Sequence, residues 1–116
     1  MNRSLFRDTV TLKVHLSDNT DYTAEYAEYV LSSVRAVERI GTTPEMVEKN
    51  AVDVYFFPSF SECRNEDGNL CPLPDCGYGD CAVLICDGKE KTMRVSYTEK
   101  HDGLTENTTH VRIRLE

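Results

Sequence analysis

All five cysteines of this 116-residue chain fall in one stretch, between Pro58 and Cys86. From the first cysteine to the fourth, the residues between them are mostly Asn, Asp, Gly and Pro, which form turns and loops rather than buried elements. An irregular span of this length in a compact domain is normally functional, disordered, or held by something other than packing. We therefore expect a long Cys-rich loop over residues 58–80 that its sulfur atoms hold in place.

The cysteine spacing, C-x7-C-x4-C-x4-C-x4-C, offers enough thiolates to bind a zinc ion. Zinc takes four such ligands in a tetrahedron, and a loop that bends freely can bring them together. The expected ligands are the four loop thiols, Cys63, Cys71, Cys76 and Cys81. Four thiolates leave no open coordination position, so this zinc would be structural. Free thiols and one or two disulfides are the alternatives.

Strict alternation of apolar and polar residues predicts strands at both ends of the chain. Residues 9–16 carry Val10, Leu12, Val14 and Leu16 on one side and polar residues on the other. By the same pattern, or by continuous apolar runs, further strands are expected over residues 51–57, 81–86, 92–97 and 109–115. Asp87-Gly88 is typical of a tight hairpin turn between two of them.

Between residues 21 and 40 the apolar residues recur instead at spacings of three and four. This spacing is typical of one face of a helix, and Gly41 supplies the left-handed residue that ends many helices. The sequence therefore predicts a long helix over about 21–40. Thr43-Pro44 fits a helix cap followed by proline at the first position, which predicts a short helix over about 44–49.

These elements predict one α+β domain over residues 1–116, with a four- to five-stranded, mostly antiparallel sheet and both helices on one of its faces. The alternation would place bases on the other face of the sheet: Lys13, His15, Arg94, His110, Arg112 and Arg114. That face is either an ordinary solvated sheet surface or a contact surface for an acidic partner or for the acidic side of a second copy, so a homodimer is compatible with it.

The chain carries a net charge of -7, from 20 acids against 13 bases, and the acid excess falls between residues 16 and 86. Such a domain is repelled by nucleic acid and by anionic membranes and attracted by a basic protein surface. No apolar run approaches the roughly 18 residues that a membrane span needs, and no apolar signal segment stands near the start. We therefore expect a cytoplasmic protein, in the host-cell cytoplasm if the chain is viral.

The sequence shows no recognisable combination of nucleophile, base and oxyanion donor, so we expect no enzymatic activity. A compact, acidic domain of this kind suits an inhibitor that occupies a partner protein, as phage anti-defence or anti-CRISPR proteins and immunity proteins do. Its acids would imitate a phosphate array against a basic, nucleic-acid-binding groove. Three tyrosines at the edge of the helix's apolar face are either a partner contact or an ordinary core boundary. The expected contact residues are Glu25, Glu28, Glu62, Glu66, Asp67, Asp75, Asp80, Tyr22, Tyr26 and Tyr29.

Two other functions stay open at this point. The first is a zinc-stabilised structural or adaptor module of a larger assembly, which would use the basic sheet face or the tyrosines as its contact surface. The second is an enzyme with a reactive cysteine in the loop, whose thiol would ionise well below its usual pKa of about 8.5.

Overall fold

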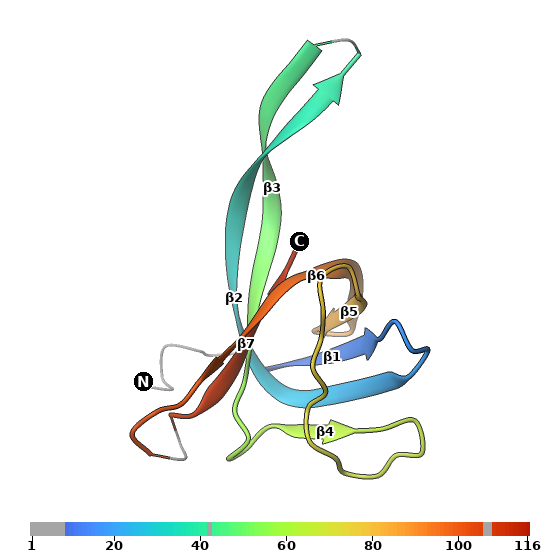
Figure 1. Ribbon diagram of the computed structural model, residues 1–116, viewed down its shortest axis with the longest axis vertical. Coiled ribbons are helices and arrows are strands. Elements are labelled where there is room, and N and C mark those ends of the chain that lie inside the picture. The colour runs from blue at the N-terminus through green and yellow to red at the C-terminus, as the bar shows by residue number, and fades with distance from the viewer. Residues whose placement is uncertain (1–8, 42, 106–107) are drawn as a thin grey trace.

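The computed structural model describes residues 9–41, 43–105 and 108–116, with the backbone alone for 32–40 and 43–49. These residues form strands and no helix, so none of them builds a helix suited to crossing a membrane. The strands, in chain order, are β1 (Thr9–His15), β2 (Asp21–Ile40), β3 (Thr43–Phe56), β4 (Glu62–Arg64), β5 (Cys81–Cys86), β6 (Lys89–His101) and β7 (His110–Leu115) (Figure 1).

Six of the strands close into an antiparallel barrel in the order β1-β5-β6-β7-β3-β2, and β2 pairs back with β1. The short strand β4 adds to β2 outside this closed set. Closure gives each of the six strands a neighbour on both edges, so the barrel leaves none of its own edges open within its paired segments.

The barrel interior is filled by the apolar residues that alternate along its strands. Leu12 and Val14 of β1, and Ile113 and Leu115 of β7, are almost completely buried. The strands predicted near 9–16, 81–86, 92–97 and 109–115 are therefore confirmed. The Asp87-Gly88 turn between β5 and β6 is confirmed too, because both residues have positive φ angles, 52° and 76°.

β2 and β3 continue far beyond the barrel as a two-stranded ribbon. β1 accompanies β2 only as far as Glu28, and β7 accompanies β3 only from Val52 to Phe56. Among the described strands, residues 30–40 of β2 pair only with β3, and residues 43–50 of β3 pair only with β2; we call these two segments the arm. Figure 1 shows the arm twisting away from the barrel along the longest dimension of the molecule, 49 Å.

The prediction of an α+β domain is wrong, because both predicted helices are strands. Residues 21–40 form β2, and residues 44–49 lie within β3. Eight of the twenty residues in β2 are Val, Ile, Thr or Tyr, which favour strands. A ribbon with no third layer need not bury one face, so it imposes no strict alternation. Gly41 does adopt the left-handed backbone, with φ 66°, but the chain turns there from β2 into β3.

The predicted sheet of four or five strands is likewise replaced by the barrel and the added strand β4. Part of the expected Cys-rich loop, residues 62–64, returns to pair with Thr23–Glu25 of β2. On that same edge of β2, pairing with β3 begins at Glu28. Tyr26 lies between the segment of β2 that pairs with β4 and the segment that pairs with β3. It has a positive φ of 59°, an unusual conformation for a bulky residue, and β2 bends there from the barrel toward the arm.

Candidate functional site

The two outer edges of the arm carry backbone groups that no other described strand pairs with. Among the described strands, residues 30–40 pair on one side only, with β3, and residues 43–50 pair on one side only, with β2. Alternate N–H and C=O groups along such edges point away from the ribbon and can pair with a further strand. Within the described chain the arm therefore has two open edges, whereas the barrel strands have neighbours on both sides.

Exposed apolar side chains lie where the arm leaves the barrel. Leu31 is 71% exposed, Val30 is 39% exposed, and Tyr26, at the bend of β2, is 52% exposed. Aromatic and aliphatic residues gathered beside an open strand edge are typical of protein contact surfaces. The base of the arm thus combines unpaired backbone with apolar surface.

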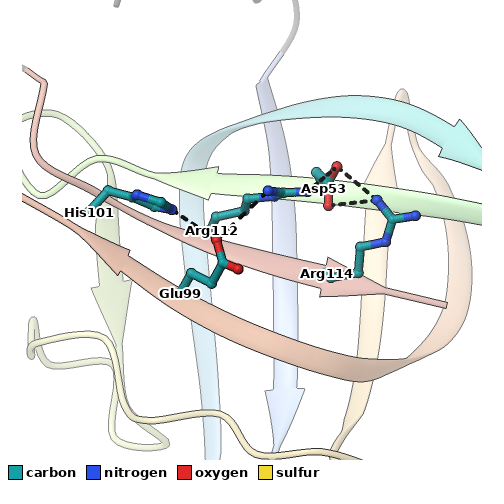
Figure 2. A network of polar contacts seen from close by, with 5 residues as sticks. All are labelled: Asp53, Glu99, His101, Arg112 and Arg114. Carbon is teal, nitrogen blue, oxygen red and sulfur yellow. Dashed lines mark hydrogen bonds and ion pairs between the residues drawn. The ribbon is translucent and has the colours of Figure 1, made fainter.

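A buried ion network fixes β3 against β7 at this base (Figure 2). Asp53 of β3 is the register partner of both Val30 and Arg114. Arg114 donates hydrogen bonds to both carboxylate oxygens of Asp53, at 3.1 and 3.3 Å, and Arg112 donates a third, at 3.3 Å. The Asp53 side chain is only 8% exposed, so the two guanidinium groups supply the compensation that a buried carboxylate needs.

The same network extends to β6. Nη1 of Arg112 lies 3.8 Å from a carboxylate oxygen of Glu99, which also contacts Nε2 of His101 at 3.0 Å. Burial by itself lowers the pKa of Arg112, but the hydrogen bond and charge of Asp53 outweigh it, so the pKa is raised. Arg112 therefore stays cationic.

Aromatic rings continue the packing beside these charges. The ring of His110 is stacked on that of His101, with centroids 4.9 Å apart, and lies 5.2 Å from the ring of Phe57. Nδ1 of His110 donates to the carbonyl oxygen of Thr108, at 2.8 Å. Together, these ion pairs and ring contacts link β3, β7 and β6 at the base of the arm. Arg112 and Arg114 of the expected basic face are consequently engaged within the chain.

Several acids expected at a contact surface do meet at the outer edge of β2 and β4. Glu25 and Glu62 are register partners on these strands. Glu66 accepts a hydrogen bond from the backbone N–H of Asp21, at 2.8 Å, and Asp67 follows in the same exposed turn. Arg64 offsets part of this charge, 3.6 Å from Glu62.

The other acids expected at that surface lie elsewhere. Glu28 is buried, with 4% of its surface exposed. Asp75 pairs with Lys100 at 2.9 Å, and Asp80 accepts the backbone N–H of Gly77 at 2.7 Å. The structure therefore does not gather the seven expected acids into one array.

The three tyrosines have different surroundings along β2. Tyr22 packs against the core, while Tyr26 is about half exposed, at 52%. Tyr29 is partly buried, and its hydroxyl lies 3.3 Å from the sulfur of Cys86.

Of the four expected zinc ligands, Cys63 and Cys71 lie side by side, with their Sγ atoms 3.8 Å apart. Cys76 is buried near them, whereas Cys81 lies on β5, where its sulfur accepts a hydrogen bond from Arg94 at 3.5 Å. Among the described residues, no three His, Cys, Asp or Glu side chains converge as metal ligands would. Structural zinc therefore stays a prediction.

Burial raises the pKa of two of these thiols, Cys63 and Cys76. It raises the pKa of Cys63 to about 12, assisted by the neighbouring Cys71. It also raises the pKa of Cys76 to about 11, assisted by Asp80 and Asp75. An enzyme's reactive cysteine is activated by a lowered pKa, so neither thiol suits that alternative function.

Sequence reasoning missed the arm and the network at its base. One signal was available, because Asp53 interrupts an otherwise apolar run and Arg112 and Arg114 alternate along another strand. A carboxylate within a buried strand requires a cation, so these residues could have been paired. No family model, curated protein or solved structure matches the chain.

Proposed function

We propose that this protein is a structural or adaptor module that joins a larger protein assembly by strand pairing along its arm. The observation that carries the proposal is the arm itself, whose two strands pair with each other and with no third strand of the described chain. Addition of a partner's strand to an open edge is a common mode of protein recognition, in which backbone hydrogen bonds supply affinity.

The energetics of the arm support a partner. An isolated two-stranded ribbon is at best marginally stable in water, because it buries little apolar surface for the backbone entropy that it loses. The exposed Leu31 and Val30 add apolar surface that water solvates poorly. A third strand on β2 would satisfy one open edge and place its own side chains beside Val30 on one face and Leu31 on the other.

The base of the arm suits such a role. Asp53, Arg112 and Arg114 tie the arm's second strand to a closed barrel with a fully buried core. A binding element mounted on a rigid support loses less conformational freedom on binding than one carried on a loose loop. The barrel therefore acts as a rigid support, and the arm provides the binding surface.

A test of the proposal compares the full chain with an arm-shortened variant. In the variant, residues 34–49 are replaced by Asn-Gly, which joins the register partners Ser33 and Asn50 through a tight hairpin turn. Molar mass by light scattering, and recovery of partner proteins from the native source, are measured for both chains. We expect the full chain to associate and the shortened chain to stay alone with an intact barrel. Equal association of both chains, or none by either, would contradict the proposal.

A second candidate is the acidic inhibitor, for which the β2–β4 edge gives a specific observation. Like charges at directly opposite strand positions, as in Glu25 and Glu62, destabilise a sheet. A basic partner surface would relieve that repulsion. Substitution of Glu25, Glu62 and Glu66 by Gln separates the two candidates, since it would abolish binding by an acidic surface, together with its steep salt dependence, and leave binding by the arm unchanged.

A further inference from the structure

We infer that Cys63 and Cys71 form a disulfide modification site, which a low-molecular-weight disulfide such as oxidised glutathione converts from two thiols to one protein disulfide. The inference is independent of the function proposed for the arm. It rests on the backbone that holds the two residues together, on the access of solvent to one of them, and on the partners of the remaining cysteines.

The two cysteines lie directly opposite each other on a small antiparallel ribbon. Arg64 and Leu70 form a β-bridge, and the N–H of Cys71 donates to the carbonyl oxygen of Cys63 at 2.9 Å. Opposite residues of antiparallel strands have Cα atoms about 4.5–5.5 Å apart. Disulfides need a Cα separation of roughly 4.4–6.8 Å, so the backbone already meets the requirement. The Sγ atoms, 3.8 Å apart, need only side-chain rotation to bond.

The turn that joins the two cysteines is held by hydrogen bonds of its own. The side-chain oxygen of Asn65 accepts the backbone N–H groups of Asp67 and Asn69, both at 3.0 Å. The backbone N–H of Asn65 donates to the carbonyl oxygen of Asn69, also at 3.0 Å. The ribbon is therefore organised before any sulfur bond forms, which lowers the entropy that closing the ring costs.

Access to the two thiols is unequal. Cys71 is half-buried and lies in the wall of an open pocket of about 470 Å³, whose other walls are largely apolar and include Phe56, Leu70 and Leu73. Cys63 is only 2% exposed. A small disulfide can therefore reach Cys71 from the pocket, and Cys63 resolves the product from inside.

The exchange balances without any other reactant. The Cys71 thiolate attacks one sulfur of oxidised glutathione, whose S–S bond breaks and releases one glutathione thiolate. The nearness of the two sulfurs, not a low pKa, drives the second step: Cys63 gives up its proton and attacks the Cys71 sulfur of the mixed disulfide, and the second glutathione leaves as its thiolate, which takes up that proton. Two protein thiols are oxidised, and one glutathione disulfide is reduced to two glutathione thiols.

The remaining cysteines have other partners. The Cys76 thiol donates to the carbonyl oxygen of Pro74 at 3.7 Å. On β5, the sulfur of Cys81 accepts a hydrogen bond from Arg94, and the sulfur of Cys86 lies beside the Tyr29 hydroxyl. Of the sulfur pairs, Cys63 and Cys71 alone show a mutual contact in the described structure.

The test exposes the folded full chain to excess oxidised glutathione, blocks residual thiols by alkylation, and maps disulfides by peptide mass. We expect a cross-linked pair of peptides carrying Cys63 and Cys71, reversed by reduced glutathione. Dominant pairing of either residue with Cys76, or no protein disulfide at all, would overturn the inference. Zinc bound by both sulfurs in the purified chain would overturn it too.

Variants identify the order of attack. In Cys63→Ser the mixed glutathione disulfide should accumulate on Cys71, whereas in Cys71→Ser neither product should form. Cys86→Ser serves as the matched control and should give the same cross-link as the unmodified chain. Because the mass map of the unmodified chain stands by itself, the inference stays testable even where the buried Cys63→Ser variant fails to fold.

Discussion

The barrel and the arm share strands β2 and β3. The two regions differ in how the edges of these strands are paired and in how far their side chains are buried. In the barrel, β2 and β3 are paired on both edges and pack inward on residues such as Val54 and Ala27, which are fully buried. In the arm the same strands pair on one edge each, and Leu31 stands in solvent. Backbone pairing alone therefore does not make a region self-sufficient, since burial supplies most of the favourable free energy.

The sharpest test of this difference substitutes one leucine in each region. Leu12→Ala removes a completely buried side chain and should lower the free energy of unfolding by about 2–5 kcal/mol, measured by denaturant titration. Leu31→Ala should change it by less than about 0.5 kcal/mol, because that side chain is mostly exposed. Similar losses in both variants would show that the arm packs as firmly as the barrel.

The second largest effect is expected at the junction of the barrel and the arm. Asp53→Ala leaves Arg112 and Arg114 without their shared carboxylate and should lower the free energy of unfolding by about 2–3 kcal/mol. Asp75→Ala is the matched control, because it breaks an exposed pair with Lys100 and should cost less than about 0.5 kcal/mol. If the two variants are equally stable, the junction network does not hold arm and barrel together.

A smaller effect is expected from alanine substitutions in the turn of each region. Gly88 in the barrel and Gly41 in the arm both have positive φ, and a Cβ added at either would meet nothing within 4 Å. Alanine should therefore cost about 1 kcal/mol of local strain at each site. Gly88→Ala should lower global stability by that amount. Gly41→Ala should mainly accelerate hydrogen exchange in the arm, because the arm opens without the barrel. Equal global losses would contradict independent opening.

The smallest effect is at the β1–β2 hairpin, on the barrel side. The hydrogen bond and charge of Asp21, 2.6 Å from Nδ1 of His15, raise the pKa of His15 above 6.5. The pair's contribution to stability is therefore complete below pH 6.5 and is lost as pH rises through the raised pKa. Asp21→Asn should return the pKa toward 6.5 in an NMR titration. An unchanged titration would exclude the pair in solution.

The parts of the fold that the sequence predicts are those with one buried face. In β1 and β7 every second residue enters the core, so alternation is imposed on the sequence and can be read from it. The arm lacks that constraint. Its spacing of Val30, Leu31 and the valines beyond them fits a helix as well as a ribbon, and only the β-branched and tyrosine content favours strands.

The candidate site was less predictable, since it depends on pairings far apart in the chain. The clustering of cysteines in sequence predicted sulfur contacts, and one such contact, between Cys63 and Cys71, is present. Which acids would meet depended on β4 returning to β2, and a three-residue strand carries little pattern of its own. Local signals cannot specify such long-range register.

The continuity of β2 and β3 from barrel to arm has a mechanical consequence. Because β3 runs from the arm directly into its ladder with β7, a force along the arm loads the five residue pairs from Val52 to Phe56 in shear. Hydrogen bonds loaded together in shear resist rupture better than bonds opened one after another. In an assembly under tension, the arm would therefore transmit the force to the β3–β7 ladder, where the ion pairs of Asp53 reinforce the contact between the two strands.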